Sequence, residues 1–226
     1  MPDLDPPRFI RDAAGLQSLA EDLRGIVRAA VDTESNSLHA YRERVCLIQI
    51  SIPGLDFLID PLALSDLAPL KDFFENPGIE KIFHAAEYDL LCLRRDFSLR
   101  VRGLYDTHAA SRALGSKECG LNALLAREFG ITLDKAMQRA NWGRRPLPDR
   151  MLDYARLDTH YLPALRDRLA EAIASAGLEE ELGDECRRLE MIPDLESTEP
   201  EGNPFWKLRG NTLTPTVWSS PLRDRR

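Results

Sequence analysis

The sequence predicts an α/β fold in which helices flank a mixed β-sheet. Strands gather early in the chain as a meander, strand and helix then alternate, and the second half is helical. With 226 residues, 43% of them hydrophobic, the chain can bury a core without disulfides or a structural metal. No apolar run approaches the roughly 20 residues of a membrane-spanning helix. The first ten residues lack the apolar segment of a secretory signal, so we expect a cytoplasmic protein without membrane contact.

The first elements are a helix and three strands. Apolar residues at helical spacing indicate a helix over 13–24. An apolar run at 29–31 leads into a strand that ends near Asp32. Residues 45–52 (VCLIQISI) and 56–60 (DFLID) have strand composition. A polar turn, HAYRER, precedes Val45, so the three strands form an antiparallel meander.

Helices dominate the rest of the chain, with one short buried strand at 81–84 (KIFH). Capping residues and glycine stops delimit the helices. A long helical region begins at Pro148, and Pro163 is expected to kink or divide it. The predicted helices span 65–74, 87–95, 106–114, 121–129, 148–176 and 178–191.

The charge is unevenly distributed, which decides what the chain can bind. The net charge of −7 argues against a general nucleic-acid binder, but residues 171–201 hold eleven acids and two arginines. The remainder is slightly basic, so a local positive groove is allowed. The four cysteines are scattered without a C-x-x-C pair. They indicate reduced, mostly buried thiols rather than a zinc site.

Two acids close the first long strand. Asp32 and Glu34 are two residues apart, so they point to the same side of a strand. Two carboxylates on one face repel unless a cation lies between them, and hard divalent cations prefer oxygen ligands. The alternative is a polar strand end with two solvated acids.

A second pair lies on a predicted helix. Tyr154 and Asp158 are four residues apart, so they share one helix face. The carboxylate could hold a metal while the phenol meets a water on it. Alternatively, Tyr154 packs in the core and Asp158 forms a surface ion pair.

Other polar residues have adequate structural explanations. Asp89 falls in the first turn of a helix, where an acid is stabilised by the helix dipole. Asp106 is interpreted as the N-cap of its own helix. The four histidines show no metal-ligand spacing, although His84 follows a predicted strand near the acids.

Together these motifs resemble the DEDD superfamily of 3′-5′ exonucleases, in the DEDDy subgroup that carries a tyrosine in its third motif. The three motifs correspond to VDTESNSL at 31–38, HAAEYD at 84–89 and YARLD at 154–158. Longer segments, including YDTHAASRALG and NWGRRPLPDRMLDYARLDTHYL, are similar to ribonuclease D and the related exosome-associated exonuclease. The resemblance covers roughly residues 25–190.

The resemblance implies a ribonuclease H-like (DnaQ-like) fold with a five-stranded mixed sheet. It implies an exonuclease domain over residues 1–192 and a tail or linker over 193–226, where related chains lead into helical HRDC domains. Two divalent ions, Mg²⁺ or Mn²⁺, would be held by four acids, and Tyr154 would orient the attacking water. The metal ligands would be Asp32, Glu34, Asp89 and Asp158. The substrate contacts would be Thr33, Leu38, His84 and Tyr88.

The expected function is metal-dependent trimming of single-stranded RNA 3′ ends with release of 5′-nucleoside monophosphates, as in transfer RNA or small-RNA processing. A DNA exonuclease of the proofreading or repair type shares the same site. An inactive domain that binds 3′ ends is the third alternative, although all five motif residues are present. Leu38 resembles a wedge between bases, or is an ordinary buried leucine. Arg144 and Arg145 bind phosphates, support the motif helix, or are ordinary surface arginines.

Overall fold

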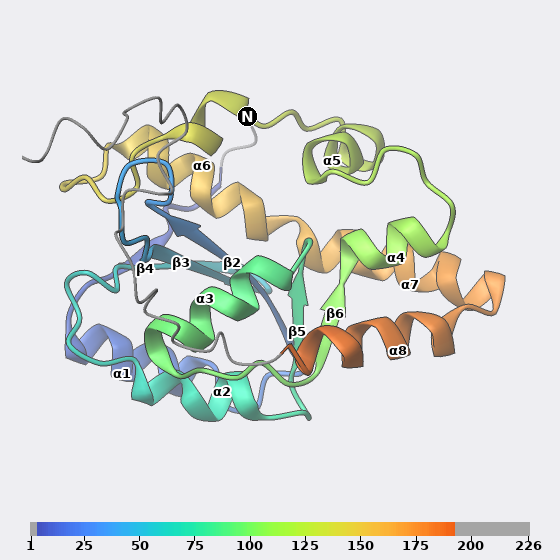
Figure 1. Cartoon of the computed structure of the whole chain (residues 1–226), viewed down its shortest axis with the longest axis horizontal. Coiled ribbons are helices and arrows are strands. Elements are labelled where there is room, and N and C mark those ends of the chain that lie inside the picture. Colours follow the sequence, from blue (N-terminus) through green and yellow to red (C-terminus); the bar gives the residue numbers. More distant parts are fainter. Residues whose placement is uncertain (1–3, 193–226) are drawn as a thin grey trace, which may run out of the picture. The chain divides into compact units, whose positions relative to one another are not determined.

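A six-stranded mixed sheet organises the protein in a computed structural model that describes residues 4–192, apart from the side chains of residues 135 and 136 (Figure 1). The strand order is β1-β4-β3-β2-β5-β6. The predicted tail over 193–226 lies outside the described residues. The strands are β1 (Arg8–Ile10), β2 (Arg28–Ser35), β3 (Val45–Ile52), β4 (Leu55–Ile59), β5 (Glu80–Phe83) and β6 (Leu104–Asp106).

The predicted antiparallel meander is confirmed. Strand β3 pairs antiparallel with β2 and with β4. Two register pairs matter below: Asp32 lies opposite Gln49, and Ser51 lies opposite Asp56. Strand β2 continues to Ser35, past its predicted end, because β3 supplies a pairing partner from Ala30 to Ser35.

The expectation of five strands was wrong by one. Strands β1 and β6 have three residues each, too short to show an alternating pattern. Long-range pairing creates them instead: β1 runs parallel to β4, and β6 runs parallel to β5. The prediction that Asp106 is the N-cap of its own helix is confirmed, and the same residue is also the last one of β6.

The helices follow the predicted order with small changes of boundary. The predicted division of the long helical region is confirmed: α6 ends at His160, and α7 begins with Pro163 in its first turn. The helices are α1 (Ala13–Asp22), α2 (Lys71–Glu75), α3 (Glu87–Phe97), α4 (Thr107–Ala113), α5 (Leu121–Phe129), α6 (Asp149–His160), α7 (Leu162–Ala176) and α8 (Glu179–Glu190), with 3₁₀ turns η1 (Ala68–Leu70) and η2 (Lys135–Arg139).

Helix α6 contacts strands β2, β3 and β4. In Figure 1 it lies above the sheet, and α1 and α2 lie below it. Strand β3 is the centre of the core, since all its residues except Ile52 are buried. The four cysteines are free thiols, three of them buried, as predicted. None of the helices between residues 4 and 192 has the length and apolar character needed to cross a membrane.

Candidate active site

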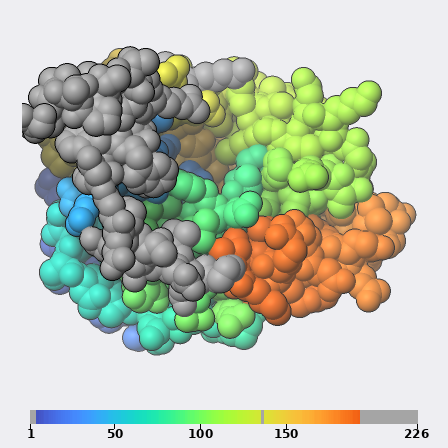
Figure 2. Space-filling view, viewed as in Figure 1, coloured from blue at the N-terminus to red at the C-terminus, as the bar shows by residue number. Residues whose placement is uncertain are grey.

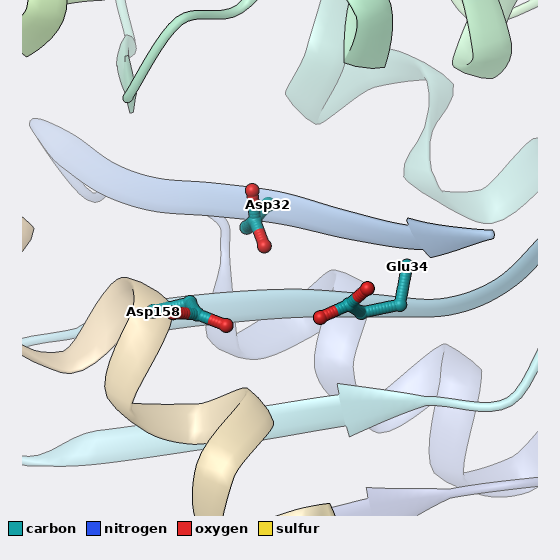
Figure 3. A group of neighbouring side chains, drawn as sticks. All are labelled: Asp32, Glu34 and Asp158. Carbon is teal, nitrogen blue, oxygen red and sulfur yellow. The ribbon is translucent and has the colours of Figure 1, made fainter. Parts of the chain in front are cut away.

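Three carboxylates meet where β2 passes beneath α6. Asp32 and Glu34 project from the same face of β2, and Asp158 projects from α6 (Figure 3). One oxygen from each of the three lies within 4.8 Å of the others. Asp158 is buried, whereas Asp32 and Glu34 are half-buried. This burial excludes the exposed surface ion pair considered for Asp158.

The fourth predicted acid reaches β2 from its open edge. Pairing between β2 and β5 covers only Arg28–Ala30, so beyond Ala30 no strand within the described residues pairs with this edge of β2. The first turn of α3 occupies this position. Asp89, in that turn, accepts a hydrogen bond from the hydroxyl of Thr33. Asp89 is therefore tied to the residue between Asp32 and Glu34.

Asp106 fixes the start of α3 from outside that helix. Its buried carboxylate accepts hydrogen bonds from the backbone N–H groups of Ala85, at 3.1 Å, and Ala86, at 2.8 Å. It also caps α4 through the N–H groups of His108 and Ala109. Ala85 has a left-handed φ of 61°, which is strained for a residue other than glycine. One carboxylate thus holds the turn that positions Asp89.

An ion pair anchors the chain just before α6. The guanidinium of Arg145 donates to both carboxylate oxygens of Asp60, each at 2.7 Å. It also donates to the carbonyl of Cys46 in β3, at 2.6 Å, and to that of Trp142, at 2.8 Å. The fork geometry of arginine suits this bidentate contact. Of the alternatives considered for Arg145, support of the motif helix agrees with these contacts, whereas Arg144 is exposed.

A buried polar network anchors the other end of α6. The Ser51 hydroxyl lies 2.7 Å from that of Thr159 and donates to Asp56 at 2.7 Å. The ring of His160 also contacts Asp56, with Nδ1 2.8 Å from a carboxylate oxygen. Burial opposes the charge on Asp56, but the hydrogen bonds from His160 and Ser51 outweigh it and lower its pKa. Helix α6 is therefore held at both ends, with Tyr154 and Asp158 between.

Burial, and after it the neighbouring carboxylates, disfavours the charged forms of the acids of the site. Burial, with the neighbouring carboxylates second, raises the pKa of Glu34 to about 9 and that of Asp32 well above its usual range. Burial also raises the pKa of Asp89 to about 7, against the lowering effect of its hydrogen bond with Thr33. Burial raises the pKa of Asp158 to about 8, partly offset by a hydrogen bond from Tyr154. Four such groups attract a cation strongly.

The residues present fit divalent ions. The donor set consists of carboxylate oxygens, which suit Mg²⁺ and Mn²⁺. A second observation supports the fit: Gln49, fully buried in β3 opposite Asp32, has no hydrogen-bond partner for either polar side-chain atom among the described residues. An unpaired buried amide costs about 1–3 kcal/mol. The site thus contains both unbalanced charge and unused hydrogen-bonding capacity.

The four predicted substrate contacts lie in different surroundings. Thr33 hydrogen-bonds Asp89. Leu38 is 65% exposed, so the interpretation as an ordinary buried leucine was wrong. Tyr88 is 45% exposed and donates a hydrogen bond to Glu43 at 2.6 Å. His84 contacts the Thr107 hydroxyl at 2.9 Å, and burial lowers its pKa to about 4, which leaves the ring neutral.

Sequence reasoning missed Gln49 and the second role of Asp106. The signal for Gln49 was present: it interrupts the apolar stretch VCLIQISI of a strand that proves to be almost wholly buried. A polar residue at such a position needs a partner. Asp106 was recognised as the cap of its own helix, but its bonds to the α3 turn depend on the pairing of β5 with β6.

A cleft of about 490 Å³ lies outside the group of three carboxylates. It is bounded by the start of α3, by α4 and by α8, and in Figure 2 the lime-green α4 region and the orange α8 border each other there. Its lining includes Asp106 but none of Asp32, Glu34 and Asp158. Charged residues of both signs line it, and Arg188 is paired with Glu185. We therefore assign the chemistry to the acidic site.

Comparison with known proteins agrees with this geometry. The family model described as a 3′-5′ exonuclease matches residues 7–174. Exosome complex exonuclease RRP6 of Saccharomyces cerevisiae is 40% identical over 177 residues, which cover 76% of this chain and 24% of the relative. The matched region spans 19% to 24% of the length of three such relatives, from Arabidopsis thaliana, yeast and Rattus norvegicus.

Solved structures show the same fold. Escherichia coli RNase D, described as an exoribonuclease involved in structured RNA processing, is 31% identical with a TM-score of 0.78, over 83% of this chain and 50% of that one. A structure of Brucella melitensis NrnC with bound Mg²⁺ has a TM-score of 0.72 at 24% identity, over 82% of this chain and 90% of that one. This second likeness concerns the fold alone. The chain therefore belongs to the 3′-5′ exonuclease family, in the branch that contains RRP6 and RNase D.

Proposed function

We propose that this chain is a metal-dependent exoribonuclease that removes nucleotides from single-stranded RNA 3′ ends and releases 5′-nucleoside monophosphates. The observation that carries the proposal is the meeting of Asp32, Glu34 and Asp158 within 4.8 Å, with Asp89 tied to Thr33 beside them. The choice of RNA follows the similarity to RRP6 and RNase D. Processing of transfer RNA or small RNA is the substrate class that this similarity favours.

The four carboxylates would hold two divalent ions, Mg²⁺ or Mn²⁺. Such a pair, when bound, supplies a water of lowered pKa and neutralises charge on the leaving 3′ oxygen. The protein's own residues set the geometry. Glu34, half-buried near the end of β2, would also meet the terminal 3′-OH, which accounts for a requirement for a free end.

Tyr154 would orient the attacking water rather than deprotonate it. Burial, together with the negative charges of Asp158 and Glu34, raises the pKa of its phenol above the ordinary value near 10. A neutral phenol at pH 7 is a hydrogen-bond donor and a poor base. Tyr154→Phe therefore tests the hydroxyl: a single-turnover rate equal to that of the wild type would exclude any role for it.

The direct test uses a 5′-labelled single-stranded RNA and a DNA of the same sequence. Each is incubated with the protein and Mg²⁺ or Mn²⁺, beside an EDTA control and the Asp32→Asn variant, and resolved on a sequencing gel. We expect an RNA ladder that shortens from the 3′ end and is lost in both controls. Equal trimming of DNA would favour a repair-type nuclease. Binding of 3′ ends without cleavage would favour the inactive alternative.

A further inference from the structure

The buried amide of Gln49 is the polar group that the site leaves unexplained. Its side chain is fully buried, and neither its nitrogen nor its oxygen has a hydrogen-bond partner among the described residues. Methionine has nearly the same shape and would fill the position without polar atoms. A glutamine is favoured there only if its amide is paired in some state of the protein.

The register of the sheet places Gln49 beside the acidic site. Gln49 lies directly opposite Asp32 in the antiparallel pair of β3 and β2, so the two side chains share one face of the sheet. On its other side, β4 presents Leu58, which is apolar. Across the strands, the polar neighbour is therefore Asp32.

Helix α6 packs against β3 on this face of the sheet. Ser51, two residues along β3 and on the same face, lies 2.7 Å from the hydroxyl of Thr159, the residue after Asp158. The Ser51 hydroxyl is already engaged with Asp56 and Thr159, so it is committed elsewhere. Asp32 lies opposite Gln49, and Asp158 directly precedes Thr159, so these two residues supply the carboxylate acceptors that the pairing register and the α6 contact bring to this face.

We propose that Gln49 is a positioning residue of the divalent-ion site, whose amide N–H groups donate to a carboxylate of the acidic cluster when the ions are held. Ionised carboxylates are acceptors only, so the nitrogen of Gln49 is the atom that can pair with them. Such a bond fixes which oxygen of the carboxylate faces the ion and keeps the carboxylate ionised. This inference rests on the proposed function, because it assigns Gln49 to the same metal site.

The test separates metal binding from folding. Gln49→Met removes both polar atoms at nearly constant shape, and Gln49→Asn keeps an amide but shortens its reach. Ile48→Val is the matched control, since Ile48 is equally buried in β3 but faces the opposite side of the sheet. Each full-length variant is measured by Mn²⁺ titration without RNA, by metal-free thermal unfolding, and by kcat and KM on RNA.

We expect Gln49→Met to unfold at the wild-type temperature or above it without metal, and to bind Mn²⁺ about 10–100-fold more weakly. Its kcat should fall at limiting Mn²⁺ with little change in KM for RNA. Gln49→Asn should lose both metal affinity and thermal stability, and Ile48→Val should keep wild-type metal affinity.

Different results would contradict the role of Gln49 and the proposed function. Gln49→Met with Mn²⁺ affinity within twofold of the wild type would overturn the inference, because the amide would then have no part in the metal site. A metal-free Gln49→Met protein that melts lower or fails to fold would also overturn it, since the amide would then be paired within the fold itself. A wild-type chain that binds no Mn²⁺ would instead refute the proposed function.

Discussion

Helices α6 and α3 each carry one acid to the same place on β2, but the protein secures them in different ways. Helix α6 is anchored at its two ends by side-chain contacts with the sheet, through Arg145 and Asp60 before it and Ser51 and Asp56 beneath its end. Helix α3 is anchored at its start by the Asp106 carboxylate, which binds backbone N–H groups. The α6 contacts are many, charged and buried, so changes there should act on stability. Helix α3 has further contacts along its length, among them Asp96 with the backbone N–H of Val45, but the Asp106 contacts hold the turn that carries Asp89, so changes there should act on metal binding.

The largest difference in cleavage rate between the two helices should appear when Asp158 of α6 and Asp89 of α3 are replaced. Asp158 belongs to the close group with Asp32 and Glu34, whereas Asp89 is held beside that group by Thr33. We expect Asp158→Asn to reduce the single-turnover rate by about 10³-fold or more, equivalent to about 4 kcal/mol. Asp89→Asn should be roughly tenfold less severe. Equal losses, measured at saturating Mn²⁺, would show that both helices deliver equivalent ligands.

The second effect is a loss of stability when the ion pair of Arg145 and Asp60, just before α6, is removed. Arg145→Met leaves the buried carboxylate of Asp60 and three carbonyl groups, those of Cys46, Trp142 and Arg144, without this donor. We expect a loss of about 3 kcal/mol of unfolding free energy in urea denaturation. Arg145→Lys should recover less than half of it, because a point charge cannot make the bidentate contact. The exposed neighbour supplies the control: Arg144→Met should change stability by about 0.5 kcal/mol or less.

The third effect is the pH dependence of the metal-free protein. In the folded chain the pKa values of Asp89, Asp158 and Glu34 are raised to about 7, 8 and 9. In the unfolded chain the same acids titrate near pH 4. Between pH 4 and 9 the folded state therefore binds more protons than the unfolded state, so the free energy of unfolding falls as pH rises.

We expect a fall of about 2 kcal/mol or more between pH 5 and 9 in urea unfolding with EDTA. Mg²⁺ or Mn²⁺ should remove most of the slope, because bound cations stabilise the ionised acids. Asp158→Asn should reduce the slope without metal. A metal-free stability that rises over this range would mean that folding does not raise the pKa values of these acids.

The sequence predicted the parts of the site that local patterns encode. Asp32 and Glu34 follow from the two-residue repeat of a strand, and Tyr154 and Asp158 follow from the four-residue spacing of a helix. These patterns predict which side chains lie on the same face of one strand or helix, but they do not predict which strands and helices contact each other. The expectation that the three segments form one site came from the resemblance to the DEDD motifs. The antiparallel meander was predictable for the same reason, since β3 and β4 have clear strand composition.

What the sequence could not supply depends on pairing between distant segments. The edge strands β1 and β6 exist because β4 and β5 offer them partners, and three residues show no periodicity of their own. Asp106 binds the α3 turn only because β6 ends beside β5. The pairing of Arg145 with Asp60 joins residues 85 positions apart, and any of several arginines could have formed it on sequence evidence alone.

The smallest effects are expected from removing a single hydroxyl group, that of Thr33 beside α3 or that of Ser51 beneath α6. Thr33→Val removes the hydroxyl that binds Asp89 and keeps a β-branched shape suited to a strand. Ser51→Ala removes the hydroxyl that joins Asp56 to Thr159 beneath α6. Each change should amount to about 1 kcal/mol, but in different measurements.

Thr33→Val should raise the Mn²⁺ concentration needed for half-maximal cleavage by about fivefold, with thermal stability nearly unchanged. Ser51→Ala should lower stability and leave the Mn²⁺ requirement at the wild-type value. If Ser51→Ala altered the Mn²⁺ requirement as much as Thr33→Val does, the contacts beneath α6 would set the ligand geometry as directly as those of α3, and the distinction between the two helices would fail.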